Sequence, residues 1–314
     1  MWIVLAFVSA LCLGGYDISK KIALREHRVI DVLTLSVLIS SLILCVPLML
    51  SRLCPETLTG TPFLVPHLNA QAHALTFLKS CIVLSSWIFG YLSLKHLPLS
   101  VVSPMQATRP MWTLIGALLI FGERLNAWQW AGVCLAIGTV FAFSFKNKSA
   151  IIHHKASVEN RYYVALALAI LIGACSGLYD KYMMRRFDHN AVQVYYTMYQ
   201  AAMMAVVWMI DRSIRKKNKD SAVSIETDKP LFLTSAILPV VLISVFLVIS
   251  DNVYMLALRD PDSLIAVVST IRRGGAVIGF AYGLLFLKEQ DAWKKILCML
   301  GILAGLVCLA LGSC

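Results

Sequence analysis

Several charged side chains stand inside long apolar stretches of this sequence, where ionised groups are unusual. They are Arg109 and the pair Arg272-Arg273, each midway along a stretch, and Asp17, Asp180 and Asp251 in three others. An arginine at the centre of a membrane helix costs about 2.5–3.5 kcal/mol on insertion scales. Each of these side chains therefore needs a counter-ion, water or a bound solute.

Two interpretations of these charges stay open. In the first, the three aspartates neutralise the three arginines as structural ion pairs, and Lys20 and Lys21 add a local partner for Asp17 on the same helix. In the second, the charges bind a solute or gate its passage. Pro104 and Pro110 favour the second, because prolines interrupt a helix and broken helices commonly line the solute sites of transporters.

Polar neighbours extend this candidate site. Gln106 shares a helical face with Arg109, and Asn252 follows Asp251 directly. The predicted substrate-binding residues are Arg109, Arg272, Gln106, Asp251, Asn252, Tyr16 and Tyr179, and the candidates for proton coupling are Asp17 and Asp180.

Covalent and metal chemistry lack a matching pattern. The nine cysteines include no CxxC pair and mostly lie in apolar stretches, which is typical of small core residues. The seven histidines lie in or near polar segments, and no serine–histidine, HExxH or paired-aspartate arrangement falls inside an apolar stretch. We expect no catalytic residue, no metal, no cofactor and no nucleic-acid partner.

The composition identifies the environment of the chain. Of its 314 residues, 59% are hydrophobic and 14% charged, with a mean hydropathy of +0.76, whereas soluble domains are roughly 25% charged. A membrane-spanning helix needs about 20 apolar residues. Ten apolar runs meet or approach this length, at 2–24, 30–51, 75–96, 99–121, 126–145, 162–184, 191–211, 231–258, 263–287 and 293–312. The sequence thus predicts an all-α membrane protein with ten transmembrane helices.

The two halves of the chain match each other in register. Tyr16-Asp17 recurs as Tyr179-Asp180, Tyr91 as Tyr254, and Arg109 as Arg272, always 163 positions later. A constant offset over four helices indicates an internal duplication. Each half holds five runs, so the second half enters the membrane in the opposite orientation. We therefore predict two inverted five-helix repeats, at 1–146 and 161–314, joined by the polar linker 146–161.

The orientation in the membrane stays open between two predictions. The connections after the first, third, fifth, seventh and ninth runs carry most of the lysines and arginines, above all the segment 212–219. The positive-inside rule then places these connections in the cytoplasm and both termini outside.

A short motif follows the fourth run of each half. The first copy is Phe121-Gly122-Glu123-Arg124-Leu125, and the second is Phe286-Leu287-Lys288-Glu289-Gln290, in which Lys288 replaces a glycine. With the duplicated five-helix layout, these motifs resemble the EamA family of the drug/metabolite transporter superfamily. The resemblance implies a carrier whose central cavity is lined mainly by helices 3, 4, 8 and 9. It also implies cytoplasmic termini, against the distribution of basic residues.

The predicted function is secondary transport of a small organic metabolite by alternating access, as an exporter or exchanger. The basic pair in the ninth run favours an anionic solute. The compact connections favour a bacterial inner membrane, and the carrier would work as a monomer or homodimer. A non-transporting membrane scaffold or sensor, or less plausibly an intramembrane enzyme, is the alternative.

Overall fold

In the computed structural model, the described part of the chain is helical. It comprises residues 2–58, 61, 64–121, 126–128, 130–132, 134–135, 138–139, 156–219, 237–260, 268, 271–272, 274–286 and 292–312. Over these residues the helices are joined by short turns, and there is no strand. The predicted all-α class is confirmed for this part of the chain. Several predicted features lie outside the described residues: most of the two motifs, at 122–125 and 287–290, then Arg273 and the linker residues 146–155.

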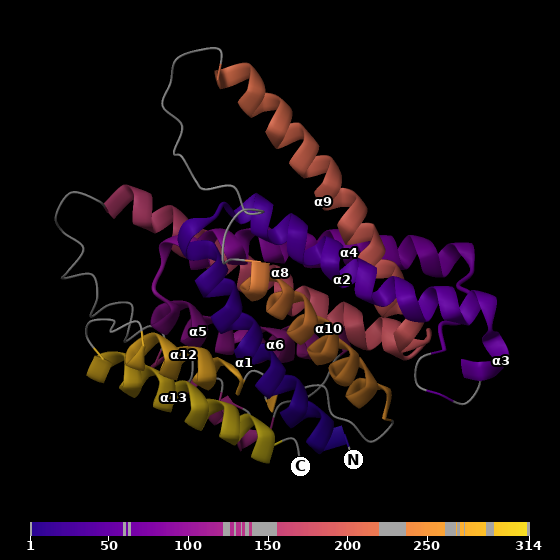
Figure 1. Cartoon of the computed structure of the whole chain (residues 1–314). Coiled ribbons are helices and arrows are strands. Elements are labelled where there is room, and N and C mark those ends of the chain that lie inside the picture. Colours follow the sequence, from indigo (N-terminus) through magenta and orange to yellow (C-terminus); the bar gives the residue numbers. More distant parts are fainter. Residues whose placement is uncertain are drawn as a thin grey trace.

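The helices follow the apolar runs closely (Figure 1). In the first half they are α1 (Trp2–Glu26), α2 (Val29–Leu53), α3 (Pro55–Leu58), α4 (Ala70–His96), α5 (Leu99–Ala107) and α6 (Arg109–Phe121). In the second half they are α8 (Ala156–Met184), α9 (His189–Lys219), α10 (Ile237–Arg259), α12 (Ala276–Leu285) and α13 (Ala292–Leu311). Within the described residues, α1, α2, α4, α8 and α10 are each long and apolar enough to cross a membrane.

Helices α8 and α9 extend beyond the predicted runs, and one short helix was not predicted. Helix α9 continues past the apolar run to Lys219, because its lysines and arginines are good helix formers even without an apolar partner. Helix α8 begins at Ala156, inside the predicted linker. The short helix α3, which begins at Pro55, was not predicted, although proline suits a first helical position.

The fourth apolar run forms two helices rather than one continuous span. Helix α5 ends at Ala107 and α6 begins at Arg109, with Thr108 between them. Pro110 has no backbone N–H, so it cannot donate to the carbonyl of Gln106 as a continuous helix would require. The Thr108 hydroxyl instead donates to the Met105 carbonyl at 2.7 Å. The break that the prolines predicted therefore falls directly beside Arg109.

Helices from the two halves pack in pairs. Helix α1 lies along α10, α4 along α8, α2 along α9, and α5 against α12. Between α1 and α10, the Ser9 hydroxyl donates to the Ser250 carbonyl at 2.8 Å, and the Ser250 hydroxyl donates to the Ser9 carbonyl at 3.0 Å. Reciprocal hydrogen bonds of this kind hold helices together in lipid, where water does not compete.

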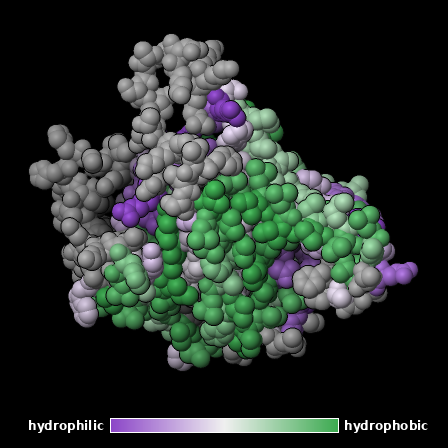
Figure 2. Space-filling view, viewed as in Figure 1, coloured by the Kyte–Doolittle hydropathy of each residue, from purple (hydrophilic) through white to green (hydrophobic). Residues whose placement is uncertain are grey.

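The outer face of the bundle is hydrophobic. Figure 2 shows a broad apolar area on the face where α1, α2 and α10 lie in Figure 1. Large apolar side chains of these three helices are well exposed, including Val4, Leu11, Leu42, Val46 and Leu238 at 59–69%. A soluble monomer rarely exposes a continuous apolar area of this kind, whereas a membrane protein turns it to the lipid.

A close approach between α1 and α12 gives a first testable prediction. A side chain added at Gly275 would overlap the carbonyl oxygen of Ala10 and approach the Gly14 nitrogen to 3.2 Å. Since backbone cannot yield as a flexible side chain does, Gly275→Ala should destabilise the protein by about 1–3 kcal/mol. Thermal unfolding in detergent measures this. Gly90→Ala is the matched control, because its nearest neighbours lie at an ordinary 3.8 Å, and equal midpoints for the two variants would contradict the packing described.

Candidate functional site

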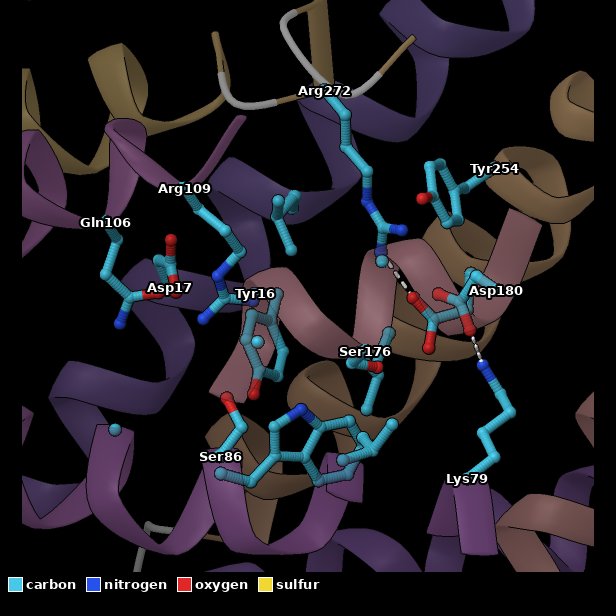
Figure 3. A pocket seen from close by; sticks show the side chains of 18 of the residues that line it. Tyr16, Asp17, Lys79, Ser86, Gln106, Arg109, Ser176, Asp180, Tyr254 and Arg272 are labelled. Carbon is cyan, nitrogen blue, oxygen red and sulfur yellow. Dashed lines mark hydrogen bonds and ion pairs between the residues drawn. The ribbon is translucent and has the colours of Figure 1, made fainter. Parts of the chain in front are cut away.

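A polar cavity lies inside the bundle, between helices of both halves. It has a volume of about 110 Å³ and is lined by residues of α1, α4, α5, α6, α8, α9 and α10, together with Arg272. Basic and acidic side chains point into it from several sides (Figure 3). The sequence analysis predicted that the charges inside the apolar runs need counter-ions, water or a bound solute. This cavity brings those charges together among apolar helices.

Arg109 enters this cavity from the first residue of α6. Its Nη2 atom donates to the Ala169 carbonyl of α8 at 3.2 Å, and its other side-chain nitrogens have no hydrogen-bond partner among the described residues. The guanidinium occupies the space left by Gly173, where a Cβ would lie 2.6 Å from both Nε and Nη2. The glycine on α8 therefore makes room for Arg109.

Arg272, at the equivalent position of the second half, is held much more fully. Its guanidinium forms an ion pair with Asp251 and lies 4.1 Å from the centre of the Tyr254 ring, a favourable cation–π arrangement. Asp251 also accepts a hydrogen bond of 2.6 Å from the Tyr196 hydroxyl. One of the predicted arginine–aspartate pairs, Arg272–Asp251, therefore forms in the structure.

The other two aspartates pair with lysines. Lys79 on α4 forms a buried ion pair with Asp180 on α8, and its Nζ lies 4.8 Å from the centre of the Tyr196 ring. Asp17 pairs with Lys20, one turn along α1, at 2.9 Å. The prediction of a local partner for Asp17 is confirmed for Lys20. Lys21 instead donates to the carbonyls of Leu94 and Leu97.

Most of the predicted site residues line this one cavity. They are Tyr16, Asp17, Gln106, Arg109, Asp180, Asp251 and Arg272. Two others point elsewhere. The Tyr179 hydroxyl donates to the Leu75 carbonyl at 3.1 Å, and the Asn252 amide donates to Asn190 and Gln193 beside a separate apolar groove. Tyr179 and Asn252 were assigned to the site because they adjoin Asp180 and Asp251 in the sequence. Consecutive residues on a helix, however, point in directions about 100° apart.

Several lining residues were not among the predicted site residues. Lys79 was the clearest signal missed, because a lysine inside an apolar run is as unusual as an arginine. Tyr91 and Tyr254 were recognised as a repeat-related pair without being placed in the site. The Tyr16 hydroxyl donates to the Tyr91 hydroxyl at 3.3 Å, and Lys20 lies 4.3 Å from the centre of the Tyr16 ring.

The described residues contain no group of three or more histidine, cysteine, aspartate or glutamate side chains placed to hold a metal ion. The arrangement consists of paired charges, tyrosine hydroxyls and one guanidinium, that of Arg109, without an ion-pair partner among the described residues. Such groups bind and release a polar solute without forming a covalent bond to it.

Comparison with known proteins supports this description of the fold. A solved structure described as "Crystal structure of protein" is 12% identical to this chain, with a TM-score of 0.65 over 99% of this chain and 98% of the other. It is one of 24 solved chains that match, and at this identity the likeness shows the fold alone. Among curated proteins, none matches the sequence.

A family comparison carries more information. The EamA-like transporter family matches residues 1–145, which coincides with the first predicted repeat of 1–146. This agrees with the resemblance found from the motifs and the duplicated layout. The chain is accordingly a multi-pass membrane protein whose residues 1–145 match the EamA-like transporter family, a family of the drug/metabolite transporter superfamily.

Proposed function

We propose that this protein is a secondary transporter of a small organic anion, which binds in the central cavity with Arg109 as its principal counter-ion. The observation that carries the proposal is the state of Arg109. It projects into the central cavity and forms no ion pair with any described residue, whereas the other charged groups that line the cavity are paired. Leaving such a charge uncompensated in a membrane is costly, and an anionic solute would offset the cost.

Alternating access is supported by the way the halves pack. If 1–146 and 161–314 are inverted repeats, α1 corresponds to α8, α2 to α9 and α4 to α10. Exchanging the two halves then turns the α1–α10 contact into the α4–α8 contact and leaves the α2–α9 contact unchanged. The principal contacts of the described helices follow this reciprocity. Two related halves that meet around a midplane cavity can rock against each other and open it to one side at a time.

The buried ion pairs supply candidates for energy coupling. Asp180, paired with Lys79, and Asp17, paired with Lys20, line the same cavity as Arg109. A proton delivered to either carboxylate would release its lysine and change the charge of the cavity during transport. We place the protein in a bacterial inner membrane, in keeping with its compact connections.

The test begins with a thermal-shift screen of the purified protein against metabolites, since a ligand that prefers the native state raises the melting temperature. Uptake of the stabilising anion into proteoliposomes then compares wild type with Arg109→Gln and Arg109→Lys. We expect Arg109→Gln to reduce uptake about 30-fold or more, because truncating one partner of a buried charged contact costs about 2–5 kcal/mol. Arg109→Lys should retain part of the activity, since it keeps the charge but not the planar two-donor geometry.

The matched control is Arg25→Gln, which removes an exposed arginine at the end of α1, away from the cavity. It should transport like wild type. Wild-type uptake by Arg109→Gln, at equal protein insertion, would remove Arg109 from the binding site and overturn the proposal.

A further inference from the structure

The charges that line the cavity do not balance. Among the described lining residues there are four basic side chains, Lys20, Lys79, Arg109 and Arg272, and three acidic ones, Asp17, Asp180 and Asp251. Each acid pairs with one base, as Asp17–Lys20, Asp180–Lys79 and Asp251–Arg272. A pair contributes no net charge whether the shared proton lies on the base or on the acid. The described lining therefore carries one positive charge, on Arg109.

The single positive charge of the cavity lining indicates which net charge a solute needs in order to bind most tightly. A solute with one negative charge makes the occupied cavity neutral, and a neutral cavity is the state least penalised when the site closes within the membrane. A solute with two negative charges would leave one excess negative charge in the same enclosed space. Phosphate monoesters carry about −1.5 to −2 at neutral pH, whereas a simple carboxylic acid carries −1.

The two arginines are not equivalent for this purpose. Arg272 already has a carboxylate from Asp251, a contact with the Ser250 hydroxyl at 3.4 Å and the Tyr254 ring beneath it. Arg109 donates to one carbonyl, that of Ala169, and its remaining donors have no partner among the described residues, so they can pair with an incoming group. A guanidinium pairs with a carboxylate through two parallel hydrogen bonds, a geometry that an ammonium cannot offer. The carboxylate of the solute therefore belongs at Arg109.

The volume of the cavity limits the rest of the solute. One water needs about 10–15 Å³ of such space, so 110 Å³ holds on the order of ten water-sized groups. A small organic acid of about ten or fewer non-hydrogen atoms fits this space. Apolar side chains also reach the cavity, from Leu13, Val83, Leu247 and Met255, so the part of the solute beyond the carboxylate can be uncharged and partly apolar.

We infer that the cavity is specific for small organic acids with a single negative charge, whose carboxylate pairs with Arg109. This inference rests on the proposed function, which requires only that the solute be anionic. It adds the charge of the solute, the chemical group that is recognised and the approximate size.

The experiment measures the melting temperature of the purified full chain with a panel of anions at matched ionic strength. The monovalent probes are sodium acetate, L-lactate and benzoate, and the divalent probes are sodium succinate and sulfate. At 100 times its dissociation constant, a monocarboxylate should raise the melting temperature by roughly 5 °C, and the divalent probes should have little effect. Arg109→Gln should abolish the difference between the two groups.

A second variant keeps the test decisive if Arg109→Gln does not fold. Gln106→Glu adds a fourth carboxylate to the lining of the same cavity, beside Arg109 in Figure 3, and makes the empty cavity neutral. It should lose the stabilisation by monocarboxylates without any change in helix content.

The possible failures are distinguishable. If succinate or sulfate stabilises the wild type more than the monocarboxylates do, and Arg109→Gln removes the effect, the anion site stands and the inferred single charge is wrong. If the monocarboxylates stabilise Arg109→Gln or Gln106→Glu as much as wild type, Arg109 is not their partner and the inference is overturned. If no anion shifts the melting temperature of the wild type at any concentration, the inference and the anionic part of the proposed function both fail.

Discussion

Gly173→Ala is expected to reduce transport about 10- to 150-fold while leaving the fold intact. The new methyl group would occupy the space in which the Arg109 guanidinium lies, with Nε and Nη2 only 2.6 Å away. The arginine is a long, flexible side chain and would move aside rather than unfold the protein. The expected loss corresponds to one hydrogen bond to a charged group, which contributes about 1.5–3 kcal/mol. Proteoliposome uptake of the most stabilising monocarboxylate measures the effect.

The control for this variant lies one turn further along the same helix. A side chain at Gly177 would meet only the Thr113 side chain, at 3.6–3.8 Å, which is an ordinary contact. Gly177 lines the same cavity, and Gly177→Ala adds a methyl group there without displacing Arg109, so it should lose far less transport than Gly173→Ala and keep a similar melting temperature. If Gly173→Ala and Gly177→Ala transport equally well, the position of the Arg109 guanidinium does not determine binding, and the assignment of this site is wrong.

The second large effect concerns the ion pair between Lys79 and Asp180. Their side chains are 2% and 11% exposed, and they come from α4 and α8, which pack against each other. Lys79→Met or Asp180→Leu alone should destabilise the protein by about 3–5 kcal/mol, because each leaves a buried charge without its partner. Thermal unfolding in detergent should show midpoints lower by roughly 10 °C.

The double variant separates the interaction from the loss of the side chains. Lys79→Met with Asp180→Leu removes both charges, so its destabilisation should be well below the sum of the two single changes, with a coupling of at least about 1 kcal/mol. Arg185→Met, which removes an exposed cation near the end of α8, serves as the control and should unfold like wild type. Additive effects of the two single changes would show that the pair does not form in the folded protein.

The local structure of this protein was largely predictable from its sequence. The apolar runs predicted the positions of α1, α2, α4, α8 and α10 because a helix in lipid satisfies its own backbone and needs only a sufficiently long apolar segment. The break before Arg109 was predictable for a similarly local reason. Pro110 lacks the N–H that would continue the helix, whatever surrounds it.

Only some of the residues that line the cavity could be predicted from the sequence. Charged residues at membrane depth are costly, so Arg109, Arg272, Asp17, Asp180 and Asp251 were recognisable as residues that needed partners. The same argument applied to Lys79 and would have found it. Tyr179 and Asn252 were assigned to the site by their neighbours in sequence, and the structure turns both away from the cavity.

The sequence by itself determined the helices, the membrane environment, the break beside Arg109 and the match of residues 1–145 to the EamA-like transporter family. Only the tertiary structure decided which charges meet. Lys79 and Asp180 are 101 positions apart, and Arg109 contacts a carbonyl 60 positions away. Helix formation depends on neighbours along the chain, whereas ion pairing depends on which helix faces come together in space. Arg109 and Arg272, which lie 163 positions apart in the sequence, thus differ in the structure: Asp251 pairs with Arg272, and no described residue forms an ion pair with Arg109.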